Sequence, residues 1–395
     1  MRQLRQGEKD LLERLVSIQG AEVGLFEVTA WQLEKNIIDA NFSIRTSFAA
    51  TGFHYYEAQP QGEDHKVIVD LALLTSSGLV ETKMSMYRPD TKGGDPRLWI
   101  YRLTTLCPEV RPDDVIAIVQ DGASCAALNL SGQEATQSRF SEVQGLFPTG
   151  PTGATGVAVE LLDRLRMIAS AGPILTERRG DTAVGYAIET ALGIKANSSK
   201  QPDYKGIEIK SGKSIRGNSN KTLFAKMFDR AMSPVGSYAG LLDKCGYFKE
   251  DGLKYLQCSV NGRAPNPQEL VLSVDYQGGL LREKWGPLHS AELVAVWELA
   301  KLQEDLANKH RETFWVEATE VRMPGGRGFA LSQVLHTSTP RLSAFTHFLS
   351  DGTIFVDHTI RQKPEGGTRD HGMLFRTQAK HLARLFKVEG EHALT

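Results

Sequence analysis

The sequence has little cysteine, no long apolar run and almost no net charge, and each of these shortages excludes a class of protein. Its 395 residues include four cysteines, which are widely spaced and form no Cys-x-x-Cys pair, so neither a disulfide scaffold nor a zinc ribbon is expected. No stretch approaches the roughly 18 consecutive apolar residues of a transmembrane helix, and the N-terminal stretch lacks the apolar centre of a signal peptide. We therefore expect a cytoplasmic protein that does not bind membranes.

The composition is that of a globular protein. Hydrophobic residues make up 41% and charged residues 24%, which excludes a largely disordered or fibrous chain. The formal charge of −1 conceals an asymmetry, because residues 1–150 carry 14 basic and 20 acidic side chains, whereas the rest of the chain has an excess of basic ones. The C-terminal part is therefore the better partner for a polyanion.

A stretch rich in proline, glycine and threonine, residues 147–156, divides the chain. It reads FPTGPTGATG, which can form neither a helix nor a central strand, so we interpret it as a linker between two domains. Residues 1–146 are predicted to form an α+β domain with a mostly antiparallel sheet, and residues 157–395 a second domain. The elements expected in the first domain are helices over 8–19 and 28–39 and strands over 65–74, 78–87, 97–103 and 114–120.

Residues 157–395 contain both helical and strand patterns. Periodic apolar residues predict the helices, and runs rich in β-branched and aromatic residues predict the strands. Residues 379–388 are expected to end the fold as a basic helix or a long strand. The other expected elements are helices over 157–171, 181–194 (capped by Asp181 or Thr182) and 291–310, and strands over 204–212, 270–276, 312–321, 352–360 and 371–377.

The segment that carries chemistry is the strand predicted at 204–212 and the residues before it. Asp203, Glu208 and Lys210 form the pattern P-D-x4-E-x-K, and Glu208 and Lys210 lie on one face because strand side chains alternate. Two converging carboxylates favour a hard divalent cation such as Mg²⁺. Lys210 could then contact the scissile phosphate, orient the attacking water or stabilise the developing charge, so the set predicts metal-assisted phosphodiester hydrolysis. Glu189, on the preceding helix, could be a further metal ligand or could polarise Lys210.

The plainer interpretation of this pattern is an exposed amphipathic strand with alternating charges. The surrounding residues favour the catalytic interpretation. Ile207 and Ile209 give the strand an apolar face, so the charges share the other face. A basic stretch without acidic residues follows, as suits contact with a phosphate backbone. Its basic residues are Lys213, Arg216, Lys221 and Lys226.

The run GDTAVGYAIETALGIKANSSKQPDYKGIEIKS, residues 180–211, resembles the catalytic core of the MvaI/BcnI restriction endonucleases, which have the PD-(D/E)xK nuclease fold and are related to the nicking enzyme MutH. The resemblance extends over roughly residues 160–390 and leaves the N-terminal part outside. It implies an α/β fold whose nuclease core has a mixed central sheet. It places these residues in the active site or its supporting helix: Thr182, Gly185, Glu189, Asp203, Glu208 and Lys210, with Asp203 and Glu208 as metal ligands.

The resemblance implies a restriction enzyme of anti-phage defence. Such an enzyme cleaves both strands of DNA at a short sequence with Mg²⁺, for which Mn²⁺ could substitute, and leaves 5′-phosphate and 3′-hydroxyl ends. It implies action as a monomer and a cognate methyltransferase. Two alternatives stay within nucleases, namely a MutH-like nicking endonuclease and a nuclease effector activated by a partner. A catalytically inactive DNA-binding protein is a further alternative, against which the intact Asp203, Glu208 and Lys210 argue.

A second polar segment, TRDHGMLFR, is the candidate for reading bases. Arginine binds guanine through two hydrogen bonds in the major groove, and aspartate can accept from cytosine N4. Together with the phosphate contacts expected from Lys213, Arg216 and Lys221, these residues form the predicted DNA interface. The plainer interpretation is a surface turn held by an Asp–Arg pair. The candidate base contacts are Arg369, Asp370, His371 and Arg376.

Other polar residues give weaker indications. His358, beside Asp357, could contact bases or could be a buried, hydrogen-bonded histidine. Arg322 and Arg327 could line the DNA cleft or belong to a plain β-hairpin turn. A zinc site built from His347, His358 and His371 is disfavoured, because their spacing matches no ligand pattern.

The distinctive stretch of the N-terminal part is MYRPDTKGGDPRLWIYRL, residues 86–103. It combines a Gly-Gly turn with Trp99 and Tyr101 on one face of a predicted strand. Such a module could be regulatory, binding DNA, an effector or a partner protein. The plainer interpretation is that Trp99 belongs to the core and that the turn is only a turn.

Overall fold

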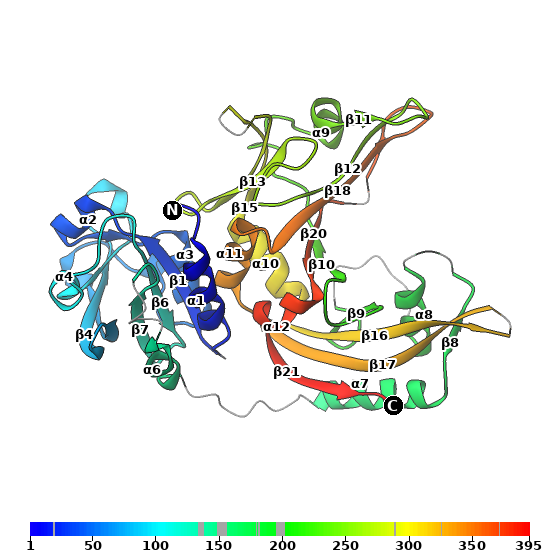
Figure 1. The fold of residues 1–395 in the computed structure, drawn as a ribbon, viewed down its shortest axis with the longest axis horizontal. Coiled ribbons are helices and arrows are strands. Elements are labelled where there is room, and N and C mark those ends of the chain that lie inside the picture. The colour runs from blue at the N-terminus through cyan, green and yellow to red at the C-terminus, as the bar shows by residue number, and fades with distance from the viewer. Residues whose placement is uncertain are drawn as a thin grey trace.

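A computed structural model of the protein describes residues 1–18, 20–132, 138–147, 156–178, 180, 182–194, 202–287, 290–324, 326–370 and 372–395. The expected linker lies outside these ranges except for its two end residues, and so do Asp181 and His371. Within the described ranges no helix is both long and apolar enough to cross a membrane. Figure 1 shows the N-terminal part in blue and cyan on one side and the C-terminal part, from green to red, on the other.

The N-terminal part is built on a seven-stranded sheet. All neighbouring strands are antiparallel except β3 and β7, which run parallel, and the four strands expected between residues 65 and 120 are all present. In spatial order the strands are β1 (Glu22–Glu27), β6 (Val115–Gln120), β7 (Cys125–Asn129), β3 (Val67–Thr75), β4 (Gly78–Tyr87), β5 (Arg97–Ile100) and β2 (Ile38–Asp39).

The first two helices begin near their expected places, but the second is shorter. It ends at Lys35 because Asn36 takes a left-handed conformation (φ 55°), which closes the helix, and β2 follows. Trp99 is partly buried against a core cluster of this part, which agrees with the plainer interpretation. The helices are α1 (Gln6–Val16), α2 (Ala30–Lys35), α3 (Phe42–Ala50), α4 (Leu103–Leu106) and α6 (Phe140–Gly145), with 3₁₀ turns at Tyr56–Ala58, Glu63–His65 and Lys92–Gly94.

One sheet of the C-terminal part is mixed, with parallel and antiparallel strands, and lies at the lower right of Figure 1. Its spatial order is β21 (Phe386–Ala393), β17 (Gly326–Pro340), β16 (Glu312–Met323) and β9 (Glu208–Gly212), and β8 (Ile174–Thr176) pairs with β17. β9 runs parallel to β16, whereas the other pairs are antiparallel. The helices α7 (Gly156–Ser170) and α8 (Ala183–Ala191) pack against this sheet. The chain thus has the mixed α/β structure that was expected.

Two further sheets complete the C-terminal part. One has the order β10 (Asn220–Ala225), β20 (Leu374–Gln378), β18 (Ile354–Gln362), β12 (Lys254–Val260) and β11 (Tyr247–Phe248), with β19 (Thr368–Arg369) on β18. The other is β13 (Leu270–Asp275), β14 (Leu280–Trp285) and β15 (Glu292–Glu298). The helices are α9 (Tyr238–Cys245), α10 (Leu299–Lys309), α11 (Leu342–Ser350) and α12 (Leu382–Leu385), with a 3₁₀ turn at Ala379–His381.

The predicted helix over 291–310 is wrong in its first half. This half is the strand β15, and the helix α10 begins only at Leu299. Four consecutive residues of β15, residues 294–297, are buried, which a strand covered on both faces allows and a surface helix does not. The segment 379–388, expected as either a helix or a strand, contains both, because the short helix α12 is followed by the start of β21.

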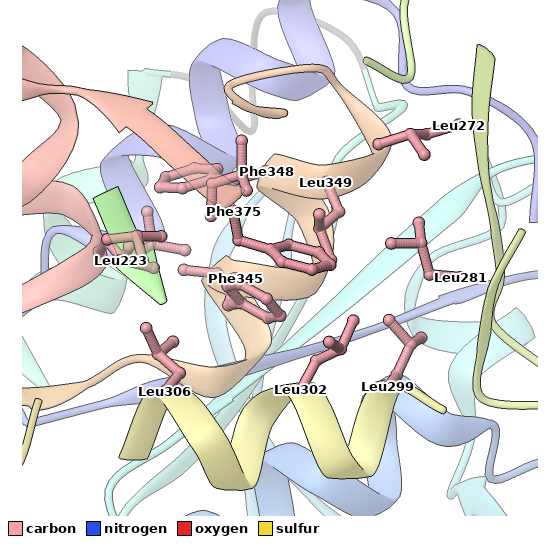
Figure 2. Close-up of a cluster of buried hydrophobic side chains, with 14 of the residues drawn as sticks. Leu223, Leu272, Leu281, Leu299, Leu302, Leu306, Phe345, Phe348, Leu349 and Phe375 are labelled. Carbon is pink, nitrogen blue, oxygen red and sulfur yellow. The ribbon is translucent and has the colours of Figure 1, made fainter. Parts of the chain in front are cut away.

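The largest hydrophobic core runs through both parts of the chain. In Figure 2 Phe345 of α11 faces Leu302 and Leu306 of α10, and Leu223, Phe375 and Phe348 lie on the side of Phe345 away from α10. Buried residues of α1, β1 and β6 belong to the same cluster. The division into domains at 147–156 stays a prediction.

A buried carboxylate of the N-terminal part caps the central helix of the C-terminal part. Glu22, on β1, is buried and accepts hydrogen bonds from the backbone N–H groups of Leu342 and Ser343, both at 3.2 Å. The Ser343 hydroxyl also donates to Glu22 and accepts from the Val23 N–H at 3.2 Å. Burial raises the pKa of Glu22, while these donors lower it. The first turn of α11 therefore depends on a residue more than 300 positions away.

Candidate active site

Strand β9 brings the central acid and the lysine of the sequence pattern together. Glu208 and Lys210 lie on one face of β9, and Ile209 between them packs into the core on the other face. The parallel partner β16 places Thr313 beside Glu208 and Trp315 beside Lys210. The short strand is thus held at the edge of the mixed sheet with its charged face toward a cleft.

Glu208 is almost completely buried and is held by two lysines. Its Oε1 is 2.6 Å from Lys210 Nζ and 3.0 Å from Lys309 Nζ, and only 1% of its surface is exposed. Burial raises the pKa of this carboxyl, but the two ammonium groups outweigh burial and lower the pKa overall. The other oxygen, Oε2, is buried without a hydrogen-bond partner. A buried carboxylate oxygen without a donor is one that a bound cation would stabilise.

Asp203 lies at the entrance to the same strand. A tight turn follows it, in which Tyr204 and Ile207 pair while Lys205 and Gly206 take positive φ values. Asp203 Oδ2 accepts a hydrogen bond from the Ile209 N–H at 2.9 Å, which fixes the carboxyl beside β9. Burial raises the pKa of Asp203, and the charge of Glu208 raises it further.

Glu189 reaches the site from α8, as its place in the sequence predicted. α8 packs against β8 and β9, and Glu189 lines a cleft together with Lys210. Burial raises the pKa of Glu189, and the charge of Asp203 adds to this shift. Gly185 lies in the same helix next to Ser211, and Thr182 stands at the start of the helix without a side-chain capping bond.

The cleft that Glu189 and Lys210 line has a volume of about 570 Å³ and a basic wall, whereas Asp203 and Glu208 lie behind its lining. Lys221 is 5% exposed, and burial lowers its pKa to about 8. Arg376 Nε donates to Thr222 Oγ1 at 3.0 Å, and one of its terminal nitrogens contacts Asp357 at 2.7 Å. Two of the residues expected to contact DNA therefore line the same cleft as Glu189 and Lys210.

The other residues expected to contact DNA lie outside the lining of this cleft. Lys213 and Arg216 are exposed in the turn after β9, and Arg216 pairs with Glu391. Arg369 is exposed on β19, and Asp370 accepts from the Thr359 hydroxyl at 3.4 Å. His371 lies outside the described residues. In this region Asp357 forms an ion pair with Arg376.

Two of the histidines considered as base contacts or metal ligands, His347 and His358, are buried and structural. His358 is 2% exposed and its Nε2 is 2.8 Å from Glu283 Oε1, so it cannot contact bases. His347 is buried beside the Tyr276 hydroxyl at 3.1 Å. In the described part of the chain no three histidine, cysteine, aspartate or glutamate side chains gather as a metal site. Arg327 pairs with Glu320 in the β16–β17 hairpin, as the plainer interpretation expected.

The sequence pattern did not reveal Lys309. This residue ends α10 and reaches Glu208 because β16, which begins three residues later, pairs with β9. The next residue, His310, packs behind Trp315, which lines the cleft. Its ring stacks on Trp315 with 5.4 Å between centroids, and its Nε2 lies 2.8 Å from the Leu223 carbonyl. Burial lowers the pKa of His310 to about 3, so it is neutral. Lys309 and His310 come to the site only because β16 pairs with β9, and this pairing cannot be read from the sequence.

Comparison with known proteins identifies the class to which this arrangement belongs. The model of the MvaI/BcnI restriction endonuclease family matches residues 162–386, more than half of the chain. The chain belongs to this family, which confirms the resemblance seen in the sequence.

The solved structures similar to this chain include two of the restriction endonuclease MvaI. One is described as a restriction endonuclease MvaI–cognate DNA substrate complex; it is 20% identical, has a TM-score of 0.54, and the match covers 62% of this chain and 100% of that one. The other is MvaI in the absence of DNA, at 19% identity and a TM-score of 0.40, covering 62% and 99%. No curated protein matches the chain. The first likeness shows that the two proteins share a fold.

Proposed function

We propose that the protein is a sequence-specific endonuclease of the PD-(D/E)xK type, which hydrolyses phosphodiester bonds of double-stranded DNA with a divalent metal ion. The observation that carries this proposal is the buried Glu208, whose Oε2 has no partner while Asp203 and Lys210 stand beside it. Burying a carboxylate in this way costs free energy that a bound cation would recover. Membership of the MvaI/BcnI family supports the same activity.

Asp203 and Glu208 would hold the metal. Their oxygen atoms fit Mg²⁺, with Mn²⁺ as a substitute, and a two-carboxylate set leaves positions for water and for phosphate oxygens. A bound ion of this kind would supply positive charge to the phosphate and would lower the pKa of the attacking water. The ion would satisfy Glu208 Oε2, which is buried without a hydrogen-bond partner.

The remaining groups would orient the reactants. Lys210 projects from the same face of β9 as Glu208 and would contact the scissile phosphate or the attacking water. Glu189, across the cleft on α8, would hold the Lys210 ammonium in place after it leaves Glu208. Lys309 would keep Glu208 ionised and fixed.

Double-stranded DNA would lie against the basic wall of the cleft, with Lys221 and Arg376 near the phosphates or bases. The similar MvaI structure is described as a complex with cognate DNA, which supports this partner. Restriction of foreign DNA, protection by a cognate methyltransferase, cytoplasmic action as a monomer and a separate domain over residues 1–146 belong to the same proposal. Sequencing the ends that the protein makes in phage DNA tests it most directly, because it reveals the recognition site and whether both strands are cut.

Metal removal is expected to abolish cleavage. Because the site offers only carboxylate oxygens, Mg²⁺ or Mn²⁺ should support cutting of plasmid DNA, and EDTA should stop it. Ca²⁺ should permit DNA binding with little cutting. Gel assays of cleavage and binding in each ion measure these effects, and undiminished cutting in EDTA would overturn the assignment of the site.

Variants of the basic residues are expected to separate base contacts from phosphate contacts. Arg369→Ala and Arg376→Ala should each cost about 1–3 kcal/mol on the cognate site and relax the preference at one base pair. Lys213→Ala and Arg216→Ala should weaken binding equally on all sequences and reduce the log–log salt slope by about 1. Binding to cognate and single-mismatch duplexes at several salt concentrations distinguishes the two patterns. Equal losses on all duplexes for the first pair would contradict their assignment.

A further inference from the structure

We propose that Lys221 is a second catalytic lysine, which donates a proton to the 3′-oxygen that leaves when the phosphodiester bond breaks. This role rests on the proposed nuclease function and adds a step to it, because a contact to the DNA backbone alone involves no proton transfer. Lys221 lies on β10 and lines the same cleft as Lys210 on β9. The two lysines therefore reach one cleft from two different sheets.

Lys221 is buried although its ammonium group has no partner. Only 5% of the residue is exposed, and among the described residues its Nζ takes part in no hydrogen bond or ion pair. The Nζ atom is nevertheless not sealed off from solvent, in contrast to Glu208 Oε2, so it faces the cleft that the side chain lines. A buried charge without a partner costs free energy. The ammonium is therefore placed for a group that enters the cleft, and its N–H donors suit an oxygen of the substrate.

Gly212 leaves the room that this ammonium occupies. A Cβ atom on Gly212 would lie 2.7 Å from Lys221 Nζ, closer than such atoms approach one another. Side chains alternate along β9, so position 212 shares a face with Glu208 and Lys210. The Lys221 ammonium thus stands where the next side chain of that face would be. Successive positions on one face of a strand are roughly 6.6 Å apart, near enough for one phosphodiester group to contact both lysines.

Burial also makes Lys221 a better proton donor than an ordinary lysine. It lowers the pKa of Lys221 to about 8, and the charge of Glu317 on β16 opposes this shift. Proton transfer is most efficient when the pKa of the donor lies near the pH of the reaction. At neutral pH the side chain is mostly protonated, so it has a proton to give.

The order of the charged groups along β9 assigns the two lysines to opposite sides of the phosphorus atom. The attacking water and the leaving oxygen lie roughly in line during such a displacement. Lys210 Nζ is 2.6 Å from Glu208, a proposed metal ligand, so it belongs to the side of the attacking water. The Lys221 ammonium lies beyond Lys210 along the same face, at position 212, and belongs to the side of the leaving oxygen.

Hydrolysis then moves two protons. The water oxygen forms a bond to phosphorus and loses one proton to solvent. The P–O3′ bond breaks, its electron pair stays on the 3′-oxygen, and the Lys221 ammonium gives that oxygen a proton and becomes a neutral amine. Solvent returns a proton to Lys221 after the product has left. The products are a 5′-phosphate and a 3′-hydroxyl end.

A substrate whose leaving atom needs no proton tests this role. Two duplexes are compared in Mg²⁺ and in Mn²⁺, one unmodified and one with sulfur in place of the 3′-oxygen at the bond that end sequencing identifies. A thiolate is a good leaving group without protonation, because its pKa is low. Lys221→Met keeps most of the side chain without its charge, and it should cut the oxygen substrate at least about 100-fold more slowly than the unmodified protein. The two proteins should cut the sulfur substrate at nearly the same rate.

Gly212→Ala is a second variant, which keeps Lys221 itself. Its methyl group would push the flexible end of Lys221 aside, so the variant should show the same pattern with a smaller loss. Lys301→Ala is the control, because Lys301 is an exposed lysine that pairs with Glu298 outside the cleft. The control should cut both substrates as the unmodified protein does. DNA binding in Ca²⁺ is measured in parallel, and for Lys221→Met it should fall far less than cleavage.

The outcomes separate this role from the nuclease function on which it rests. If Lys221→Met is slowed by the same factor on both substrates, Lys221 is a phosphate contact only, and the proposed role is overturned while the nuclease function stands. The role is also overturned if Lys221→Met cuts the oxygen substrate at the unmodified rate. If the unmodified protein cuts neither substrate, the nuclease function is wrong and the role of Lys221 falls with it. Gly212→Ala decides the matter if Lys221→Met does not fold.

Discussion

Replacing Lys210 with alanine is expected to reduce the rate of DNA cleavage by at least about 100-fold, the loss typical of removing one group that stabilises charge in a transition state. Asp203→Ala should have a similar or larger effect, because it would remove one of the two proposed ligands of the metal ion. Both side chains are fixed before any ligand binds: Lys210 by its contact with Glu208, and Asp203 by the Ile209 N–H. Their loss should therefore change the chemistry more than the fold.

Single-turnover cleavage of plasmid DNA measures this effect, and DNA binding in Ca²⁺ serves as the parallel measurement. Lys205→Ala is a matched control, since Lys205 is an exposed lysine of the same segment that pairs with Glu160 outside the cleft. The control should cleave at nearly the unmodified rate, and Lys210→Ala should lose far more cleavage than binding. If both active-site variants cleave normally, the active site lies elsewhere in the molecule.

Replacing Glu22 with alanine is expected to lower the free energy of unfolding by about 1–3 kcal/mol for each buried donor that loses its acceptor. Three donors are at stake: the N–H groups of Leu342 and Ser343 and the Ser343 hydroxyl. Because Glu22 is buried, with only 7% of its surface exposed, water does not readily replace its oxygens. The change should therefore rank among the most destabilising single substitutions outside the hydrophobic core.

Urea unfolding followed by circular dichroism measures this loss. Glu63→Ala is the matched control, because Glu63 is 74% exposed and its ion pair with Lys66 contributes little. If Glu22→Ala is no less stable than Glu63→Ala, the cap does not hold the two parts together. A drop in stability confined to Glu22→Ala would show that the N-terminal part supports the central helix of the C-terminal part.

The sequence predicted what depends on neighbours along the chain. The alternation of Glu208 and Lys210 and the position of Asp203 at the mouth of the strand follow from the two-residue period, and the structure has both. The position of Glu189 near Lys210 could be predicted as well, because a helix that precedes the strand and packs against it can present the side chain to the same pocket. Lys309 could not be predicted, since it reaches Glu208 only through the parallel pairing of two strands about 100 residues apart.

The errors have the same physical origin. The apolar residues of β15 have a spacing that also suits a helix. The segment forms a strand because it pairs with β14 and packs its side chains into the core. His358 and Asp357 are neighbours on β18 and point to opposite faces of the sheet. The sequence does not show which face is buried, and only the structure places His358 on the buried face, against Glu283. Among the arginines, Arg376 lines the cleft whereas Arg369 does not, a difference that the short motif does not contain.

The contact between Glu22 and α11 has a consequence for how the chain is made. Its two sides are 321 residues apart, so β1 leaves the ribosome long before its partner is synthesised. A contact of such high sequence separation forms late and slowly, because the loop must close before the contact can stabilise anything. During this interval the apolar residues of α1 and β1 that belong to the shared core lack their partners, which exposes the nascent chain to aggregation. Chaperones that act at the ribosome should therefore raise the yield of this protein more than changes at its surface.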